Sequence, residues 1–283
     1  MSEVRVTTAT LRQMKAEGRP VTMLTAYDFP LARLVDEAGI DVILVGDSLG
    51  NVVLGYETTV PVTMDDMVHH VRAVARGVRR ALVVADMPFL SYQVSVEDAL
   101  RNAGRLLQEG GAHAVKIEGG AAVLDVVRAL VGAGIPVMGH LGLTPQSVHQ
   151  LGGFKVQARD AAAANRLLDE ARALEEAGIF ALVLECIPAP LARMVTGALG
   201  VPTIGIGAGP DCDGQVLVTH DLLGLTGGRV PRFVKQYADL RARMLAAVGA
   251  YRDEVVARLF PGPEHTFGMP EDEIERLRKE GAE

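Results

Sequence analysis

The chain has 283 residues, a formal net charge of −7 and a hydrophobic fraction of 49%, which together exclude a disordered chain. Its two cysteines, Cys186 and Cys212, are too few for a disulfide framework or a cysteine-based zinc site. An acidic chain is also poorly suited to bind phosphate backbones, so we expect no nucleic-acid partner.

Short apolar runs recur along the chain and predict strands. They are continuously apolar rather than alternating, which is typical of strands buried on both faces of a parallel sheet. In chain order the runs cover residues 21–27, 42–46, 82–86, 114–118, 136–140, 181–185, 202–207 and 216–220.

Helical patterns fill the gaps between these runs. Thr63 and Ser95 each precede a helical segment as a hydroxyl cap, and acidic residues follow in the first turn. Several segments lead into the next strand through a glycine before a β-branched residue, as at Gly39 and Gly178. The predicted helices cover residues 10–17, 30–38, 64–79, 96–109, 121–132, 160–177 and 189–199.

Strands that alternate with helices predict a single (β/α)8 TIM barrel, in preference to a doubly wound open sheet. No linker rich in proline, serine or charge divides residues 20–260, so we expect one barrel domain over residues 1–283 with its core at about 20–260. A short N-terminal helix would close the bottom of the barrel. Residues 261–283 would form a charged C-terminal appendage with a helix at 271–279.

The chain shows no membrane-spanning pattern. Its most apolar stretch, residues 121–138, is interrupted by Asp125, Arg128 and several glycines, whereas a span needs about 20 apolar residues. The N-terminus has no apolar core of a signal peptide. We therefore expect no membrane partner and a cytoplasmic location, which agrees with the sparse cysteines.

Charged side chains concentrate at the ends of the predicted strands. In a barrel the carboxyl ends of the strands face the active site. Burying several carboxylates there is costly unless a positive charge neutralises them, and a divalent cation is the simplest one. An all-oxygen set of ligands suits Mg²⁺ rather than zinc. The strand-end residues are Asp47, Ser48, Asp86, Lys116, Glu118, His140 and Glu185.

Each of these residues also has a structural interpretation. A single acidic residue at a strand end often caps a helix, and His140 fits a barrel-end structural histidine at least as well as a catalytic one. Four carboxylates on four strands are harder to explain in this way. Lys116 and Glu118 are two residues apart on one strand and therefore share a face, which favours a common site.

Two further features are weaker. The glycines of residues 205–209 are typical of a phosphate-binding loop after the seventh strand, but close packing produces the same pattern, and Pro210 follows where a helix would have to begin. Cys186 follows Glu185 and has no basic residue beside it in the sequence. We interpret Cys186 as a small buried residue.

Six segments resemble the ketopantoate hydroxymethyltransferase family (3-methyl-2-oxobutanoate hydroxymethyltransferases). They occur in order and extend over about residues 5–262. The resemblance implies cytoplasmic homo-oligomers, commonly decamers. The segments are DSLGNVVLGYETTVPVTMDDM at 47–67, ADMPFLSY at 85–92, AVKIEGG at 114–120, GHLGLTPQSVHQLGGFKVQAR at 139–159, LECIP at 184–188 and TIGIGAGPDCDGQVLVTHDLLG at 203–224.

The resemblance also implies an activity. The family transfers a hydroxymethyl group from 5,10-methylenetetrahydrofolate to 3-methyl-2-oxobutanoate through a magnesium-stabilised enolate. The product is 2-dehydropantoate (ketopantoate), in the first step of pantothenate and hence coenzyme A biosynthesis. Matched by motif, the magnesium ligands, for one ion per subunit, would be Asp47, Asp86 and Glu118. The contacts to the oxo acid would be Asp47, Ser48, Asp86 and Lys116, and the proton acceptor would be Glu185.

Two alternatives stay open at this point. Another magnesium-dependent enzyme of 2-oxo acids, resembling isocitrate lyase or phosphoenolpyruvate mutase, would place acidic ligands at the same strand ends. It would be expected to contain a cysteine loop such as KKCGH, which this sequence does not contain. A non-catalytic barrel that serves as a binding module would tolerate neutral residues at the strand ends, yet all the acidic residues are present.

Overall fold

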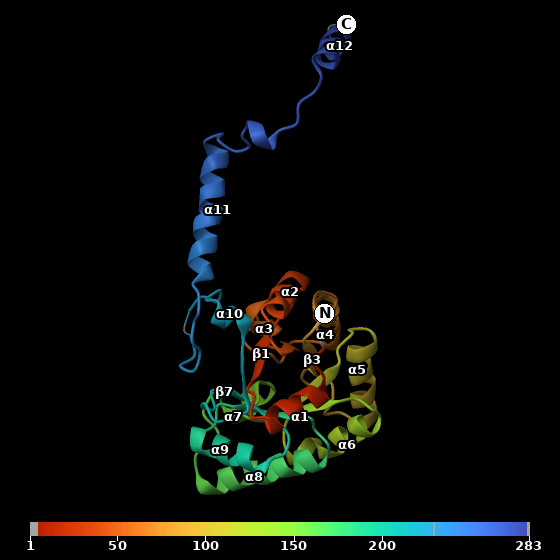
Figure 1. Ribbon diagram of the computed structural model, residues 1–283, viewed down its shortest axis with the longest axis vertical. Helices are drawn as coiled ribbons and strands as arrows, with labels where there is room; N and C mark the ends of the chain where they lie inside the picture. The colour runs from red at the N-terminus through yellow and green to blue at the C-terminus, as the bar shows by residue number, and fades with distance from the viewer. Residues whose placement is uncertain (1–4, 229, 282–283) are drawn as a thin grey trace. The chain divides into compact units, whose positions relative to one another are not determined.

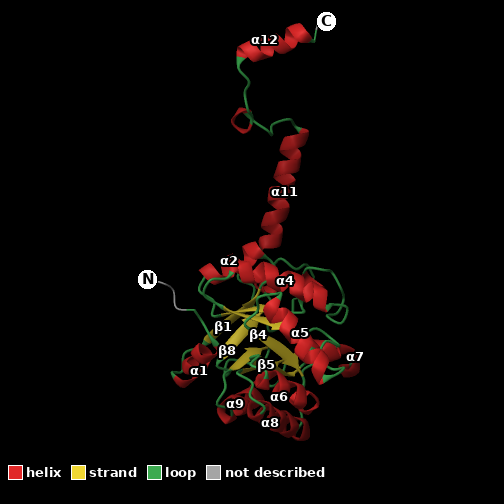
Figure 2. Cartoon of the chain, turned by 90° about the vertical axis from the view of Figure 1, so that its right-hand side faces the viewer, coloured by secondary structure: helices red, strands yellow, loops and turns green. Residues whose placement is uncertain are grey.

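Parallel strands close into a barrel in the computed structural model, which describes residues 5–228 and 230–281. Each strand pairs with the next along the chain, and β8 pairs back with β1. Helices surround the strands (Figure 1, Figure 2), so the predicted (β/α)8 fold is confirmed. The strands are β1 Val21–Thr25, β2 Val42–Val45, β3 Leu82–Asp86, β4 Ala114–Glu118, β5 Val137–Gly142, β6 Ala181–Glu185, β7 Thr203–Ile206 and β8 Gly214–Leu217.

The longer helices up to β8 begin and end within three residues of the predicted boundaries, and short helical turns lie in the loops. The longer helices are α1 Thr8–Ala16, α2 Phe29–Glu37, α4 Met64–Gly77, α5 Val96–Gln108, α6 Leu124–Gly132, α8 Ala161–Glu176 and α9 Ala189–Ala198. The short ones are α3 Leu49–Val52, η1 Ala121–Val123, η2 Pro145–Ser147, α7 Val148–Leu151 and α10 Thr219–Leu222.

The predicted helix signals act as expected. The Thr63 side chain accepts a hydrogen bond from the backbone N–H of Asp66 at the start of α4, and Ser95 does the same for Asp98 in α5. Gly39 and Gly178 adopt φ values of +84° and +100° after α2 and α8. Glycine adopts this left-handed region without steric cost, so the chain can turn sharply into the next strand.

Alternation along the strands builds two apolar layers. Met23, Val84 and Met138 belong to the cluster inside the barrel. Val83 and Leu182 belong to the larger cluster between the strands and the helices. Because successive side chains of a strand point to opposite faces, a continuous apolar run fills both layers at once.

Three strands (β3, β4 and β6) match their predicted bounds, and the other five differ by one to three residues. β8 was expected at residues 216–220 but covers Gly214–Leu217, and His220 lies in α10. A side chain at Gly214 would clash with the backbone oxygen of Val21, so glycine lets β8 begin against β1. β5 extends two residues beyond its predicted end, to Gly142.

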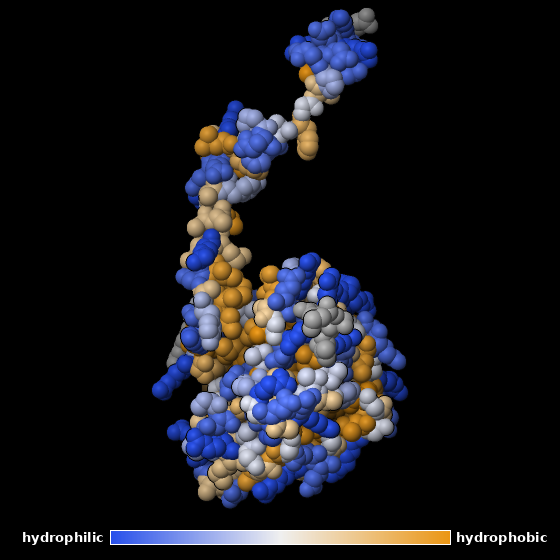
Figure 3. All heavy atoms as spheres, in the orientation of Figure 1, coloured by the Kyte–Doolittle hydropathy of each residue, from blue (hydrophilic) through white to orange (hydrophobic). Residues whose placement is uncertain are grey.

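A second compact unit follows the barrel. The chain divides into residues 1–237 and 238–283, whereas we expected the barrel core to reach about residue 260. The second unit contains α11 Leu240–Val256, η3 Pro263–His265 and α12 Glu271–Glu280. Helix α11 was not predicted, and none of its residues is buried. Its exposed apolar side chains (Figure 3) include Met244, Val248, Tyr251 and Val255.

None of the helices within the described ranges combines the length and the hydropathy that a bilayer crossing requires.

Candidate active site

Parallel pairing brings the charged strand ends to one rim of the barrel. Asp86 pairs with Lys116 across β3 and β4, Glu118 pairs with His140 across β4 and β5, and Gly142 pairs with Glu185 across β5 and β6. Asp47 and Ser48 follow β2 after Gly46. The predicted residues are therefore brought together by register and not only by their position at strand ends.

Five of these side chains are removed from solvent. Asp47, Asp86, Lys116, Glu118 and His140 are between 2% and 5% exposed. Three carboxylates and one lysine at this depth cost free energy unless each charge has a partner. The contacts around Lys116 provide much of that compensation.

Lys116 lies at the centre of the cluster. Its Nζ is 3.0 Å from Asp86 Oδ1 and 3.6 Å from Glu118 Oε1, and 3.0 Å from His140 Nδ1. Burial alone would lower the pKa of Lys116, but the charges of Asp86 and Glu118 outweigh burial and raise it. Lys116 is therefore positively charged at neutral pH.

The three carboxylates respond differently to this environment. Burial and the charge of Asp86 raise the pKa of Asp47 well above its ordinary value. Burial also raises the pKa of Asp86, although Lys116 counteracts the effect. For Glu118, a hydrogen bond with His140 and the charge of Lys116 outweigh burial and lower the pKa. One lysine does not balance the negative charge, so a further cation would stabilise the cluster.

His140 connects the cluster to Glu185. Its Nδ1 lies 3.3 Å from Glu118 Oε1, and its Nε2 lies 3.2 Å from Glu185 Oε2. Burial and Lys116 lower the pKa of His140, but hydrogen bonds with both glutamates outweigh them and raise it to about 9. The Glu185 side chain is 15% exposed, so an entering molecule can reach it more easily than the buried members of the cluster.

The Ser48 hydroxyl contacts a tyrosine that follows the neighbouring strand β1. The Tyr27 hydroxyl, after β1, lies 2.8 Å from Ser48 Oγ, and Tyr27 is 1% exposed. A Cβ atom at Gly46 would come within 2.8 Å of Ser48 Oγ and 3.4 Å of Asp86 Oδ2. Glycine at position 46 therefore leaves the room in which these polar groups meet.

Sequence reasoning missed Gln146, which Tyr92 holds in place. Gln146 Nε2 donates to Asp47 Oδ2 at 2.9 Å, and its backbone N–H donates to Glu118 Oε2 at 3.1 Å. The Tyr92 hydroxyl lies 2.8 Å from Gln146 Oε1. Both residues come from loops. Their only sequence signal was their place inside two of the family-like segments.

A metal site with three protein ligands is not assembled in the described part of the chain, where no group of three His, Cys, Asp or Glu residues is arranged to hold an ion. Glu118 is engaged by Lys116, His140 and the N–H of Gln146. Asp86 Oδ1 is ion-paired with Lys116 at 3.0 Å. The one hydrogen bond found to the Asp47 carboxylate goes to Oδ2 and leaves Oδ1 available. Mg²⁺ commonly takes one or two carboxylates and completes its shell with water and substrate, and this donor set fits such an open site.

The weaker sequence features have local explanations. A Cβ atom at Gly207 would come within 2.9 Å of the Phe233 ring, and one at Gly209 would clash with Ala189, so these glycines serve close packing. Cys186 is half-buried. Burial, and then the charge of Glu185, raises the pKa of its thiol to about 12. The thiolate that nucleophilic chemistry needs is therefore scarce at neutral pH.

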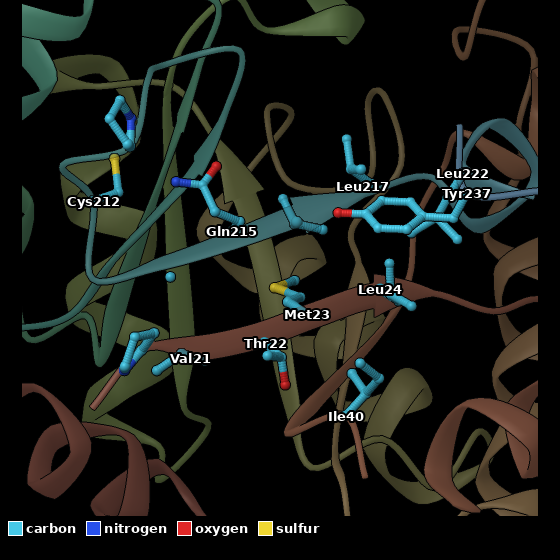
Figure 4. Close-up of a pocket in the computed structure, with 14 residues that line it drawn as sticks. Val21, Thr22, Met23, Leu24, Ile40, Cys212, Gln215, Leu217, Leu222 and Tyr237 are labelled. Atoms are coloured by element: carbon cyan, nitrogen blue, oxygen red, sulfur yellow. The ribbon is translucent and has the colours of Figure 1, made fainter. Parts of the chain in front are cut away.

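A further pocket, shown in Figure 4, lies elsewhere in the barrel. It encloses about 530 Å³ and is lined by β1 and β8 together with Leu222 and Tyr237. Figure 4 shows Leu24, Leu217 and Tyr237 at its apolar end. None of the described strand-end acids lines it, so it is not the site that the charged cluster forms.

Comparison with known proteins agrees with the sequence-based interpretation. The family model of ketopantoate hydroxymethyltransferase matches residues 5–263. A 3-methyl-2-oxobutanoate hydroxymethyltransferase from Moorella thermoacetica is 65% identical over 263 residues, which is 93% of this chain and 98% of the relative. One from Thermoanaerobacter sp. is 60% identical over 271 residues, 96% of this chain and 99% of the relative.

The rival interpretation shares the fold alone. The crystal structure of a 2,3-dimethylmalate lyase of the PEP mutase/isocitrate lyase superfamily has a TM-score of 0.55 and 18% sequence identity, over 95% of this chain and 93% of the lyase. The sequence comparisons, not this structural likeness, decide the family. The chain belongs to the ketopantoate hydroxymethyltransferase family.

Proposed function

We propose that the chain transfers a hydroxymethyl group from 5,10-methylenetetrahydrofolate to 3-methyl-2-oxobutanoate, giving 2-dehydropantoate for pantothenate biosynthesis. One observation carries the proposal beyond family membership. A buried lysine among three carboxylates stands beside an accessible glutamate at the same rim of the barrel. This arrangement combines a polar binding site for an oxo acid with a carboxylate that can act as a general base.

The carboxylate-rich end of the cluster would hold one Mg²⁺ per subunit. Asp47 and Asp86 are the nearer candidates. The one hydrogen bond found to the Asp47 carboxylate goes to Oδ2 and leaves Oδ1 for the ion, and Asp86 would share Oδ1 between the ion and Lys116, which lies 3.0 Å away. Glu118 stands beside them as the third proposed ligand. When bound, the ion supplies Lewis acidity toward the oxygens of the oxo acid.

The chain's own residues would then bind the oxo acid and remove its C3 proton. Lys116 places a positive charge where negative charge develops on the oxo acid, and Ser48, Asp47 and Asp86 complete its seat. Glu185 accepts the C3 proton as a carboxylate, which His140 Nε2 orients from 3.2 Å. C3 then bonds to the methylene carbon, both bonds from that carbon to the folate nitrogens break, and water supplies the hydroxyl oxygen of the product. Tetrahydrofolate leaves, and its two nitrogens take up the C3 proton and one proton of the water.

The proposal extends to the oligomeric state of the enzyme and its location in the cell. We propose a cytoplasmic homo-oligomer, with a decamer as the state that the family resemblance implies. Light scattering of the purified full chain tests the oligomeric state. A monomer at micromolar concentration would contradict it.

The direct test is an assay with and without a chelator. The full chain should form 2-dehydropantoate from the two substrates, and EDTA should abolish the activity because the seat then lacks its Lewis acid. Added Mg²⁺ should restore it. No product at any Mg²⁺ concentration would contradict the proposed activity, and full activity in EDTA would contradict the metal.

Replacement of Asp47 tests the metal seat separately. We expect Asp47→Ala to weaken Mg²⁺ binding in calorimetry at least about tenfold, since even loss of a residue behind a ligand has that effect. Because burial and Asp86 raise the pKa of Asp47, its charge destabilises the metal-free fold at neutral pH. The variant should therefore unfold at an equal or higher temperature without metal. Asp125→Ala, whose side chain is 89% exposed, is the control, and equal Mg²⁺ affinity in all three proteins would contradict the ligand role.

A further inference from the structure

Gln146 joins the ends of three strands beneath the proposed site. It belongs to η2, in the loop after β5, and is 5% exposed. Its side-chain nitrogen donates to Asp47 Oδ2, after β2, and to the backbone oxygen of Met87, after β3, both at 2.9 Å. Its backbone N–H donates to Glu118 Oε2, at the end of β4, at 3.1 Å.

The orientation of the Gln146 amide follows from its partners. Nε2 faces two acceptors, a carboxylate oxygen and a backbone carbonyl, and a glutamine nitrogen offers two N–H groups to match them. Oε1 faces the Tyr92 hydroxyl at 2.8 Å, which donates to it. Exchanging the two ends of the amide would place its oxygen against two acceptors, so only one orientation satisfies the contacts.

By donating to one oxygen of a carboxylate, Gln146 leaves the other oxygen to contact a bound ion or a neighbouring side chain. At Asp47 it engages Oδ2, which leaves Oδ1. At Glu118 the Gln146 N–H engages Oε2, while Oε1 faces Lys116 and His140. Both oxygens of Asp86 are engaged, because the backbone N–H of Asp47 donates to Oδ2 at 3.0 Å and Lys116 Nζ lies 3.0 Å from Oδ1.

We infer that Gln146 is a positioning residue for the proposed Mg²⁺ site, which consists of Asp47, Asp86 and Glu118. It holds the Asp47 carboxylate by Oδ2, so that Oδ1 can face the ion, and it holds Glu118 by Oε2, so that Oε1 stays beside Lys116 and His140. Hydrogen bonds from residues behind the ligands orient ligating carboxylates in this way. The inference rests on the proposed function, because the ion belongs to it.

Calorimetry with Mg²⁺ tests the inference. Gln146→Met keeps the length and burial of the side chain but cannot donate to Asp47. Gln146→Asn keeps the amide but is one methylene too short to reach. We expect both folded variants to bind Mg²⁺, in the presence of 3-methyl-2-oxobutanoate, at least about tenfold more weakly than the wild-type chain. The Mg²⁺ concentration for half-maximal activity should rise by a similar factor, and the rate at saturating Mg²⁺ should change less.

Ser91→Ala is the matched control. Ser91 is 4% exposed and its hydroxyl donates to the Pro88 backbone oxygen at 2.7 Å, so the variant loses a buried hydrogen bond near the site without touching a carboxylate. It should bind Mg²⁺ within twofold of the wild type. If either Gln146 variant is folded, as thermal unfolding reports, and binds Mg²⁺ within twofold, the positioning role is overturned while the proposed function stands. If the wild-type chain binds no Mg²⁺, the metal seat and this inference fail together.

Discussion

Glu185→Gln should abolish exchange of the C3 hydrogen of 3-methyl-2-oxobutanoate with solvent. The change keeps the size of the side chain and removes the basic carboxylate. Positioned general bases contribute about 10²- to 10⁴-fold to a rate, so we expect a loss of that size in C3 deuterium exchange followed by NMR. Binding of Mg²⁺ and of the oxo acid should remain, because Glu185 lies outside the proposed Mg²⁺ site and contacts the cluster through His140.

The same substitution should change His140. The pKa of His140 is raised to about 9 in part by the hydrogen bond with Glu185, so an amide at position 185 should lower the pKa measured by NMR titration. Glu176→Gln, an exposed position on α8, is the control and should alter neither quantity. Wild-type exchange rates in Glu185→Gln would remove Glu185 as the base, whatever the overall activity of the variant.

The sequence predicted the rim of the barrel well for a physical reason. A continuous apolar run that ends in a charged residue, as in Leu82–Asp86 or Ala181–Glu185, marks both the strand and its open end. Since parallel strands share the direction of their carboxyl ends, such residues meet without any knowledge of long-range contacts. All the strand-end acids were predicted in this way.

Gln146, which sequence reasoning missed, and its partner Tyr92 lie outside such patterns. Gln146 and Tyr92 are polar residues in polar loops, and their burial arises only when the loops after β3 and β5 close over the strand ends. Nothing local in the sequence distinguishes them from exposed loop residues.

Helix α11 could have been predicted from the sequence, but the compact unit to which it belongs could not. Asp239 caps it by accepting from the N–H of Ala242, and the run that follows is rich in strong helix formers. What the sequence does not reveal is that this helix belongs to a unit separate from the barrel. Local signals predict elements, whereas the assignment of elements to units depends on contacts between them.

Lys116→Met should cost the fold more than any other single change at the site. Lys116 is 4% exposed, with Asp86 Oδ1 at 3.0 Å, and breaking a buried ion pair costs about 3–5 kcal/mol because the remaining charges lose their partner. Loss of a positive charge at the developing anion should also reduce kcat by about a hundredfold or more. Denaturant unfolding and steady-state kinetics measure the two effects.

The stability loss should depend on pH with a definite sign. Without Lys116, the pKa values of Asp86 and Glu118 would lie higher in the folded chain than in the unfolded one, where they are about 4. The folded variant then binds more protons than the unfolded variant, and its stability falls as pH rises above that value. The difference from the wild-type chain should therefore be small near pH 4 and full near pH 7.

Arg33→Met separates this effect from the general loss of an ion pair. Arg33 pairs with Glu37 at 2.8 Å, but both side chains are 58% exposed. Exposed pairs contribute little, so the stability of this variant should stay within about 0.5 kcal/mol of the wild type at every pH. A loss in Lys116→Met that does not vary with pH would mean that the lysine fills space rather than balances charge. In that case the carboxylates at the rim would be neutral even without Lys116. A cluster without net negative charge would need no bound cation to stabilise it.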